Sequence, residues 1–296
     1  MSIVALTYGL LMLSVVALWI PDPWPAWRWS PQIASASFVA ALVCALAAGI
    51  VGWRGVVAAA VMLGACYAFP RRPRGTLLRW TCGAAIIVLS ALLMAHALAG
   101  FANVKVLSGV RFSADAVPYT QYLNFDKALV GLFILGFCHE RLLTAGAWRT
   151  MLAKAAPRAL GIIVILTALA RLAGYVRFDP KLPPQFPFWA AVNLLFTCVP
   201  EEALFRGFIQ HRLGTARAAL VAAAVLFGLA HFAGGPLYVA LATAAGLGYG
   251  WVYARTDSIE ASILTHFAVN VTHLLLFTYP ALARSFASAI IVAGGV

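Results

Sequence analysis

The chain consists of long apolar runs separated by short polar segments. Most runs are rich in Ala, Leu, Val and Gly and show no alternation of apolar and polar positions. Runs of this length satisfy their backbone hydrogen bonds in lipid as helices, so the pattern predicts an all-α, polytopic transmembrane helical bundle of about 8–10 spans. The candidate spans are residues 3–20, 34–52, 56–69, 81–101, 128–146, 159–175, 187–212, 217–232, 237–253 and 259–279.

The composition agrees with a membrane protein. The 296 residues are 63% hydrophobic and 10% charged, and the mean hydropathy is +0.92, which excludes an ordinary soluble domain. A formal net charge of +12 could suggest a nucleic-acid partner, but the basic residues gather in short clusters between apolar runs. Such clusters are typical of cytoplasmic loops, so we expect no nucleic-acid partner.

The basic clusters also predict the orientation of the chain. With the spans above, the clusters at 71–79, 149–158, 206–217 and Arg255 fall on one side, which we assign to the cytoplasm. The loops at 102–127 and 177–187 then lie outside. The first run, residues 3–20, lacks a basic start and leads into Trp24, Trp27 and Trp29, which are typical of an interfacial belt. We expect a retained first span and an integral protein of the bacterial inner (cytoplasmic) membrane, surrounded by the lipid bilayer.

Two acidic residues and an arginine interrupt the apolar pattern. Glu201, Glu202 and Arg206 follow twelve apolar or weakly polar residues, 188–199. A charged side chain at bilayer depth costs about 2.5–3.5 kcal/mol on insertion scales, so it usually persists because it has a function. On a helix, Glu202 and Arg206 share a face, while Glu201 points about 100° away. We therefore expect Glu202 to pair with Arg206 and Glu201 to face another helix.

Two of the six histidines lie inside apolar runs, each at helical spacing from another residue of interest. His231 ends the segment that begins at Phe227, and His266 is followed four residues later by Asn270, so the last two share a helix face. His96 lies in an Ala/Leu-rich run, and we interpret it as a hydrogen-bonded or packing residue.

The depth of these residues tests whether they can meet. Counted from a cytoplasmic turn at residues 212–217, Glu201 lies about 16 Å and His231 about 21 Å inward, which allows contact across a helical hairpin. His266 lies only about 9 Å from Glu260 by the same count, so its helix must tilt or begin deeper to join them.

A carboxylate, two imidazoles and an amide can form a water-activating site. The carboxylate accepts a proton from water, and the other groups position the water or stabilise an oxyanion. Zinc is a rival interpretation, because Glu201, His231 and His266 supply a three-ligand set, although the chain has no HExxH motif. A non-enzymatic transporter or scaffold that uses the Glu/His/Arg network as a proton relay or packing device also fits the residues.

Three spaced motifs resemble the CPBP family of membrane proteins. The family comprises the type II CAAX prenyl endopeptidases and the bacterial bacteriocin-processing and abortive-infection proteins. The motifs are EExxxR (Glu201, Glu202, Arg206), FxxxH (Phe227, His231) and HxxxN (His266, Asn270), and the resemblance covers roughly residues 187–273.

The resemblance implies an intramembrane endopeptidase with an all-helical core. It would act on membrane-embedded, membrane-associated or lipidated proteins or peptides. The implied roles are Glu201 as the base, His231 as its partner in activating water, His266 with Asn270 as oxyanion donors, and Glu202 with Arg206 as supporting residues. Some members are described as metalloproteases; we favour a metal-free glutamate mechanism and no cofactor, because Asn270 suits an oxyanion better than zinc.

The resemblance also suggests how the chain is organised. We expect amino-terminal transmembrane helices of unknown role over residues 1–180, a protease-like core over 181–279, and a short apolar tail over 280–296.

Overall fold

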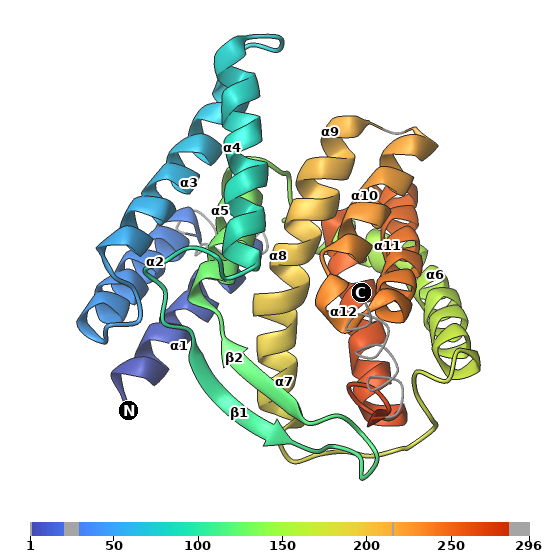
Figure 1. Ribbon diagram of the computed structural model, residues 1–296. Coiled ribbons are helices and arrows are strands. Elements are labelled where there is room, and N and C mark those ends of the chain that lie inside the picture. Colours follow the sequence, from blue (N-terminus) through green and yellow to red (C-terminus); the bar gives the residue numbers. More distant parts are fainter. Residues whose placement is uncertain (1, 21–29, 215, 284–296) are drawn as a thin grey trace, which may run out of the picture. The chain divides into compact units, whose positions relative to one another are not determined.

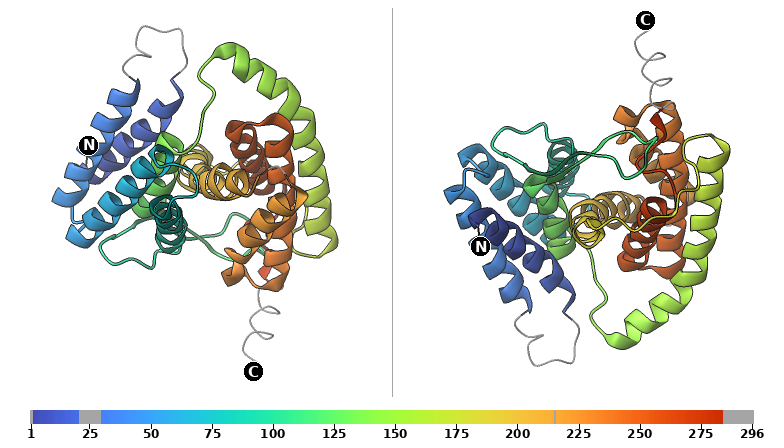
Figure 2. Two further views of the ribbon diagram at one scale, coloured as in Figure 1. Left: turned by 90° about the horizontal axis from the view of Figure 1, so that it is seen from above. Right: turned by 90° about the horizontal axis from the view of Figure 1, so that it is seen from below.

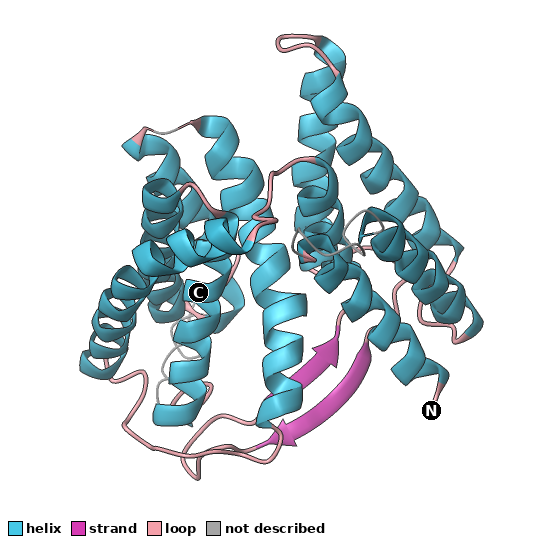
Figure 3. Ribbon diagram, turned by 180° about the vertical axis from the view of Figure 1, so that it is seen from behind, coloured by secondary structure: helices cyan, strands magenta, loops and turns pink. Residues whose placement is uncertain are grey.

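The computed structural model describes residues 2–20, 30–214 and 216–283 of the chain (Figure 1). Regular structure in this part is almost entirely helical, which confirms the predicted all-α polytopic class (Figure 3). The predicted aromatic belt at Trp24, Trp27 and Trp29, and the tail beyond residue 283, lie outside the described residues.

Six helices of the described part are long and apolar enough to cross a membrane. They are Trp53–Arg71, Leu77–Met94, Ala145–Leu172, Phe186–Leu213, Pro236–Thr256 and Ile259–Leu276. Three further apolar helices are shorter: Ile3–Trp19, Gln32–Ala47 and Arg217–Leu229.

The chain forms two compact units built from interleaved segments. Unit 1 contains Met1–Val104, Tyr122–Arg149 and Leu194–Ile209, and unit 2 contains Lys105–Gln121, Thr150–Asn193 and Gln210–Val296. The helix Phe186–Leu213, called the long helix below, supplies residues to both units. The predicted division of the chain into residues 1–180 and 181–279 is a functional one and stays a prediction.

Unit 1 is organised around helix α5. Its helices are α1 (Ile3–Val16), α2 (Ser30–Ala47), α3 (Trp53–Arg71), α4 (Leu77–Met94) and α5 (Phe125–Phe137), with α8 (Val199–Glu202) from the long helix. Helix α5 contacts α1, α3, α4 and α8, and nearly all its residues are buried. Tyr8 of α1 packs its ring against Phe125 and Phe196, and its hydroxyl donates to the Leu123 carbonyl at 2.8 Å. Burial on all sides explains why the α5 sequence beyond Lys127 is apolar over its whole circumference.

Unit 2 is a helical bundle. Its helices are α6 (Ala145–Leu172), α7 (Phe186–Asn193), α9 (His211–Leu213), α10 (Arg217–Leu229), α11 (Pro236–Thr256) and α12 (Ile259–Leu276). Small residues bring α10 and α11 together: a Cβ added at Gly246 would lie 3.0 Å from the Cα atom of Ala224. Figure 2 shows α6 running along the side of this bundle, where Gly248 of α11 packs against Ile162.

The predicted outer loop at residues 102–127 contains regular structure that the sequence analysis did not anticipate. Strands β1 (Val104–Val110) and β2 (Tyr119–Leu123) form a two-stranded sheet, and α5 begins at Phe125. Val and Tyr residues in these strands suit a pleated surface. The loop prediction was therefore wrong in its local structure.

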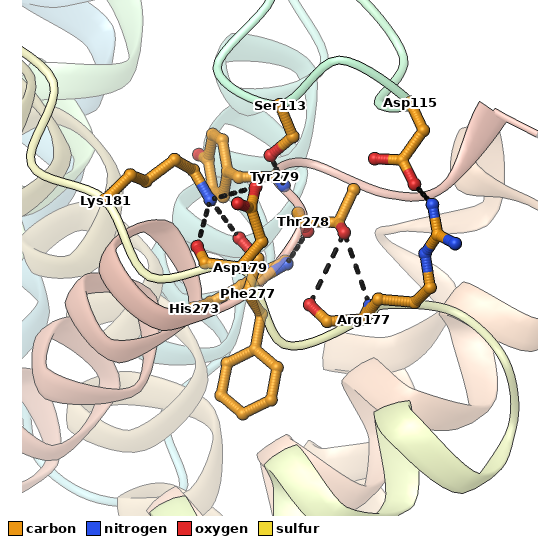
Figure 4. A network of polar contacts seen from close by, with 9 residues as sticks. All are labelled: Ser113, Asp115, Arg177, Asp179, Lys181, His273, Phe277, Thr278 and Tyr279. Carbon is orange, nitrogen blue, oxygen red and sulfur yellow. Dashed lines mark hydrogen bonds and ion pairs between the residues drawn. The ribbon is translucent and has the colours of Figure 1, made fainter.

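The predicted outer loops meet at one end of unit 2 (Figure 4). Arg177 forms an ion pair with Asp115, and the Tyr279 backbone N–H donates to Ser113 Oγ at 3.4 Å. Lys181 Nζ lies 3.1 Å from Asp179 Oδ2. The first two contacts bring Ser113 and Asp115 next to Tyr279 and Arg177, and the side of the membrane on which the two loops lie stays a prediction.

Candidate functional site

The long helix is irregular around the two predicted acidic residues. The α-helical segment Val199–Glu202 lies between two π-helical turns, Leu194–Cys198 and Ala203–Gln210. Pro200 has no N–H to donate to the carbonyl one turn earlier, and such a gap favours a widened turn. π-Helical turns occur frequently at functional sites. The sequence thus places a local distortion of the helix at its acidic residues.

Glu202 and Arg206 form a fully buried ion pair in unit 1. Arg206 Nη1 donates to Glu202 Oε1 at 2.9 Å, and both side chains are 0% exposed. The spacing of four residues predicted this pair, and the structure confirms it. Each charge compensates the other, because either one alone would be costly in this environment.

Glu201 contacts a different cation, which comes from another helix. It is 4% exposed, and its Oε1 accepts a hydrogen bond from Lys127 Nζ at 2.7 Å. Lys127 belongs to the first turn of α5, within the stretch that the sequence analysis assigned to an outer loop. That assignment was wrong at its end, because the charged start of α5 has buried partners.

Asp126 fixes the start of α5 through several polar contacts. Its carboxylate is 1% exposed, accepts a hydrogen bond from Asn103 Nδ2 at 2.9 Å and lies 2.8 Å from His96 Nδ1. The backbone N–H of Lys127 also donates to it, at 2.8 Å. His96 is therefore a hydrogen-bonded residue, as predicted. The network satisfies the buried carboxylate and fixes the turn from which Lys127 projects.

In unit 2, His231 lies just beyond the end of α10. The helix ends at Leu229, so the prediction that His231 lies inside a helix ending near 232 was wrong by a few residues. Gly235, with a φ of +84°, and Pro236 start the next helix and force the chain to turn here. His231 Nδ1 lies 2.7 Å from the Phe227 carbonyl. Because a carbonyl only accepts, Nδ1 carries the proton, and Nε2 is the basic nitrogen of the neutral ring.

His266 and Asn270 lie on one face of α12, as their spacing predicted. The His266 ring stacks on Tyr249 with centroids 4.6 Å apart and an angle of 17°. Asn270 Nδ2 donates to Asn193 Oδ1 at 3.2 Å. Asn193, at the end of α7, therefore orients the Asn270 amide.

One pocket of unit 2 joins three of the four predicted catalytic residues. His231, His266 and Asn270 all line a cavity of about 110 Å³, together with Phe227 and Tyr249. The Phe227 ring lies 4.7 Å from the His231 ring and 5.7 Å from the His266 ring. The aromatic residues thus hold the two imidazoles in place within a largely apolar wall.

The depth mismatch predicted for His266 does not keep it from His231. The count assumed that α12 begins at the surface, but Ile259 and Glu260 in its first turn are 0% and 3% exposed. The helix therefore begins among packed residues. Glu201 belongs to unit 1, so its predicted meeting with His231 stays a prediction.

The described residues of either unit, taken alone, do not form a metal site. They gather no group of three or more His, Cys, Asp or Glu side chains that could hold a metal ion. The predicted zinc set needs Glu201 of unit 1 as well as His231 and His266 of unit 2, and it stays a prediction. A metal at Glu201 would also compete with the Lys127 ammonium.

Sequence reasoning missed Lys127, Asn193, Tyr249 and His273, the last of which lines the pocket. His273 follows Asn270 by three residues and so shares its helix face, a signal that was present. Lys127 stands beside Asp126 at the start of an apolar run, which was a second signal. The contacts of Asn193 and Tyr249 depend on tertiary packing, and no signal in the sequence indicated them.

Residues 183–272 match the protein family described as Type II CAAX prenyl endopeptidase Rce1-like. The match covers all three spaced motifs and confirms the resemblance that they predicted. The comparison with curated proteins and the comparison with solved structures each gave no match. The matched segment includes Asn193 and the four predicted catalytic residues, whereas Lys127 lies outside it.

Proposed function

We propose that this membrane protein is an intramembrane endopeptidase that hydrolyses peptide bonds of membrane-associated or lipidated substrates. The family match over residues 183–272 supports peptidase activity. The observation that carries the proposal is the shared pocket of His231, His266 and Asn270, because it collects two imidazoles and an amide donor in an apolar setting.

In the proposed reaction, Glu201 activates water. Its carboxylate takes a proton from water while the water oxygen bonds to the carbonyl carbon of the substrate. His231 helps to position this water through Nε2, since Nδ1 is engaged with the Phe227 carbonyl. The result is a tetrahedral intermediate with one negatively charged oxygen.

Asn270 and His266 stabilise that oxygen in the proposed mechanism. Asn270 Nδ2 donates to Asn193 Oδ1 at 3.2 Å, which orients the amide, and an amide nitrogen carries two N–H donors. When the intermediate collapses, the C–N bond breaks and Glu201 returns its proton to the leaving amine. The products are a carboxylic acid and an amine, which exchange a proton to become a carboxylate and an ammonium, and the site is restored.

The pocket wall suggests which part of a substrate enters it. Phe227, Tyr238 and Tyr249 are aromatic, and Leu241 and Val269 are aliphatic. Such a wall favours an apolar side chain or an acyl or isoprenoid-like group next to the scissile bond. The six apolar helices support an integral membrane protein, and we propose the bacterial inner membrane as its location.

We favour a mechanism without a metal. The partly buried Lys127 ammonium beside Glu201 supports this choice, because it already supplies the positive charge that a metal ion would otherwise bring to the carboxylate. A chelator should then leave turnover unchanged. Loss of turnover with chelator, restored by zinc, would overturn the metal-free mechanism and favour the set Glu201, His231 and His266.

The test is cleavage of membrane-bound reporter peptides by the purified full-length protein in liposomes. Glu201→Gln and His231→Ala should each lower kcat at least about 100-fold. Glu140→Gln is the matched control, since Glu140 is exposed and lies outside the motifs. Wild-type turnover in both site variants would refute the proposal. Absence of cleavage by the wild type across apolar and lipidated peptides would favour a transporter or scaffold.

A further inference from the structure

The buried acids of the long helix have two separate sources of positive charge. Glu202 contacts Arg206 one turn later on the same helix, at 2.9 Å. Glu201 contacts Lys127, at 2.7 Å, from a helix 74 residues earlier in the chain. The cation beside the proposed base therefore lies outside the segment that matches the peptidase family.

Helix α5 is shaped to bring Lys127 to this position. Gly131 follows Lys127 by four residues and shares its helix face. A Cβ added at Gly131 would lie 2.9 Å from Val199 Cγ1 and 3.1 Å from the Pro200 nitrogen. Only a residue without a side chain allows α5 to approach α8 this closely, and the close approach lets the lysine reach the next residue, Glu201.

The start of α5 is also held in place around Lys127. Asn103 Oδ1 accepts from the Phe125 N–H at 3.0 Å, and Asp126 accepts from the Lys127 N–H at 2.8 Å. The lysine side chain itself is only 14% exposed. A long, flexible side chain is thus fixed at its backbone and at its charged end.

We propose that Lys127 is a positioning residue that orients the Glu201 carboxylate for catalysis, an inference that rests on the proposed function. The ammonium fixes Oε1, so Oε2 is the oxygen that takes the proton from water. This proposal gives the amino-terminal helices a role in the reaction. The family resemblance assigns them no role.

The charge of Lys127 also fits the later step of the reaction. After water attacks, Glu201 is a neutral acid with its proton on Oε2, and the ammonium still contacts Oε1. Transfer of that proton to the leaving amine restores the carboxylate and with it the ion pair, while the C–N bond breaks. Lys127 keeps its own protons throughout, so the step balances without a further reactant.

The experiment compares Lys127→Met, Lys127→Arg and Lys181→Met in the full-length protein in liposomes. Methionine keeps the unbranched stem and removes the charge. Lys181 is the matched control, because its side chain is also 14% exposed and also pairs with a carboxylate, that of Asp179. We expect Lys127→Met to lower kcat about 100-fold at unchanged KM, as for a misplaced catalytic group. Lys127→Arg should restore most of the kcat, and Lys181→Met should keep it.

Folding is followed by thermal unfolding of each variant. If Lys127→Met does not fold, Lys127→Leu replaces it, because leucine fills the apolar space but neither donates to Oε1 nor carries a charge. A folded, uncharged variant with wild-type kcat overturns the inference, and so does an equal loss of kcat in Lys181→Met.

Glu201→Gln separates this inference from the proposed function. If Glu201→Gln is inactive while Lys127→Met is fully active, only the role of Lys127 fails. If Glu201→Gln retains wild-type turnover, the proposed function fails, whatever Lys127 does.

Discussion

Asn270 donates through Nδ2 to Oδ1 of Asn193 at 3.2 Å, which joins the HxxxN motif of α12 to the end of α7. An amide that is free to rotate can present either its oxygen or its nitrogen to a ligand. The contact with Asn193 fixes the nitrogen side of Asn270 and makes the amide a hydrogen-bond donor in the pocket.

Replacement of Asn193 should therefore affect the reaction rather than substrate binding. We expect Asn193→Leu to lower kcat about 10- to 100-fold with little change in KM, because the oxyanion donor loses its orientation. Asn193→Asp keeps the acceptor oxygen and should restore much of the activity. Steady-state kinetics with a reporter peptide measures kcat and KM of both variants. Wild-type kcat in Asn193→Leu would contradict an orienting role.

The Glu202–Arg206 pair should contribute to stability through mutual compensation. Removal of one partner leaves an uncompensated buried charge, so Glu202→Gln and Arg206→Met should each destabilise the protein by about 3–5 kcal/mol. The double variant should lose clearly less than the sum of the two. Unfolding in detergent measures these free energies, and strictly additive losses would show that the two charges do not interact energetically.

Helix spacing predicted which residues share one face of a helix. Glu202 with Arg206, and His266 with Asn270, are four residues apart, and helical geometry alone places such pairs on one face. The fold class followed in the same way from the length of the apolar runs. These predictions needed no knowledge of how the helices pack.

Contacts between helices were beyond the sequence pattern. Lys127 reaches Glu201 because Gly131 allows close packing of α5, and no periodicity within α5 reports its neighbour. The end of α10 was also missed by about three residues, because Ala230, Phe232 and Ala233 continue the apolar run and the turn residues Gly234, Gly235 and Pro236 come only after them. Hydropathy indicates burial in lipid, but it does not distinguish a helix from a turn that is made of apolar residues.

Gly228 should be essential for the packing that supports His231. A Cβ at this position would lie 1.9 Å from Thr243 Oγ1 and 2.9 Å from the Val239 carbonyl. Gly228→Ala should therefore destabilise the protein by about 1–3 kcal/mol, as overpacking does. It should also lower turnover, since the Gly228 carbonyl accepts from the His231 N–H at 2.9 Å.

Gly161→Ala on α6 is the control for that substitution. A Cβ there meets nothing within 4 Å, so the change should be neutral or stabilise the helix by up to about 1 kcal/mol. Thermal unfolding of both variants, together with reporter cleavage, makes the comparison. Equal stability of the two variants would refute close packing at Gly228.

The outer loops of unit 2 should give the protein a pH-dependent increment of stability through Asp179. A hydrogen bond from the Ser113 hydroxyl, helped by the charges of Lys181 and Arg177, holds the pKa of Asp179 below its usual value of 3.8. A carboxyl whose pKa is lowered by folding stabilises the native state above its unfolded pKa. That stabilisation is lost as the pH falls through the folded pKa.

Asp179→Asn should therefore be less stable than the wild type at pH 7, by only about 0.2–1 kcal/mol because the side chain is 40% exposed. The difference should shrink as the pH is lowered below 3.8, and a pH-independent difference in unfolding free energy would contradict the ionic origin of the contact.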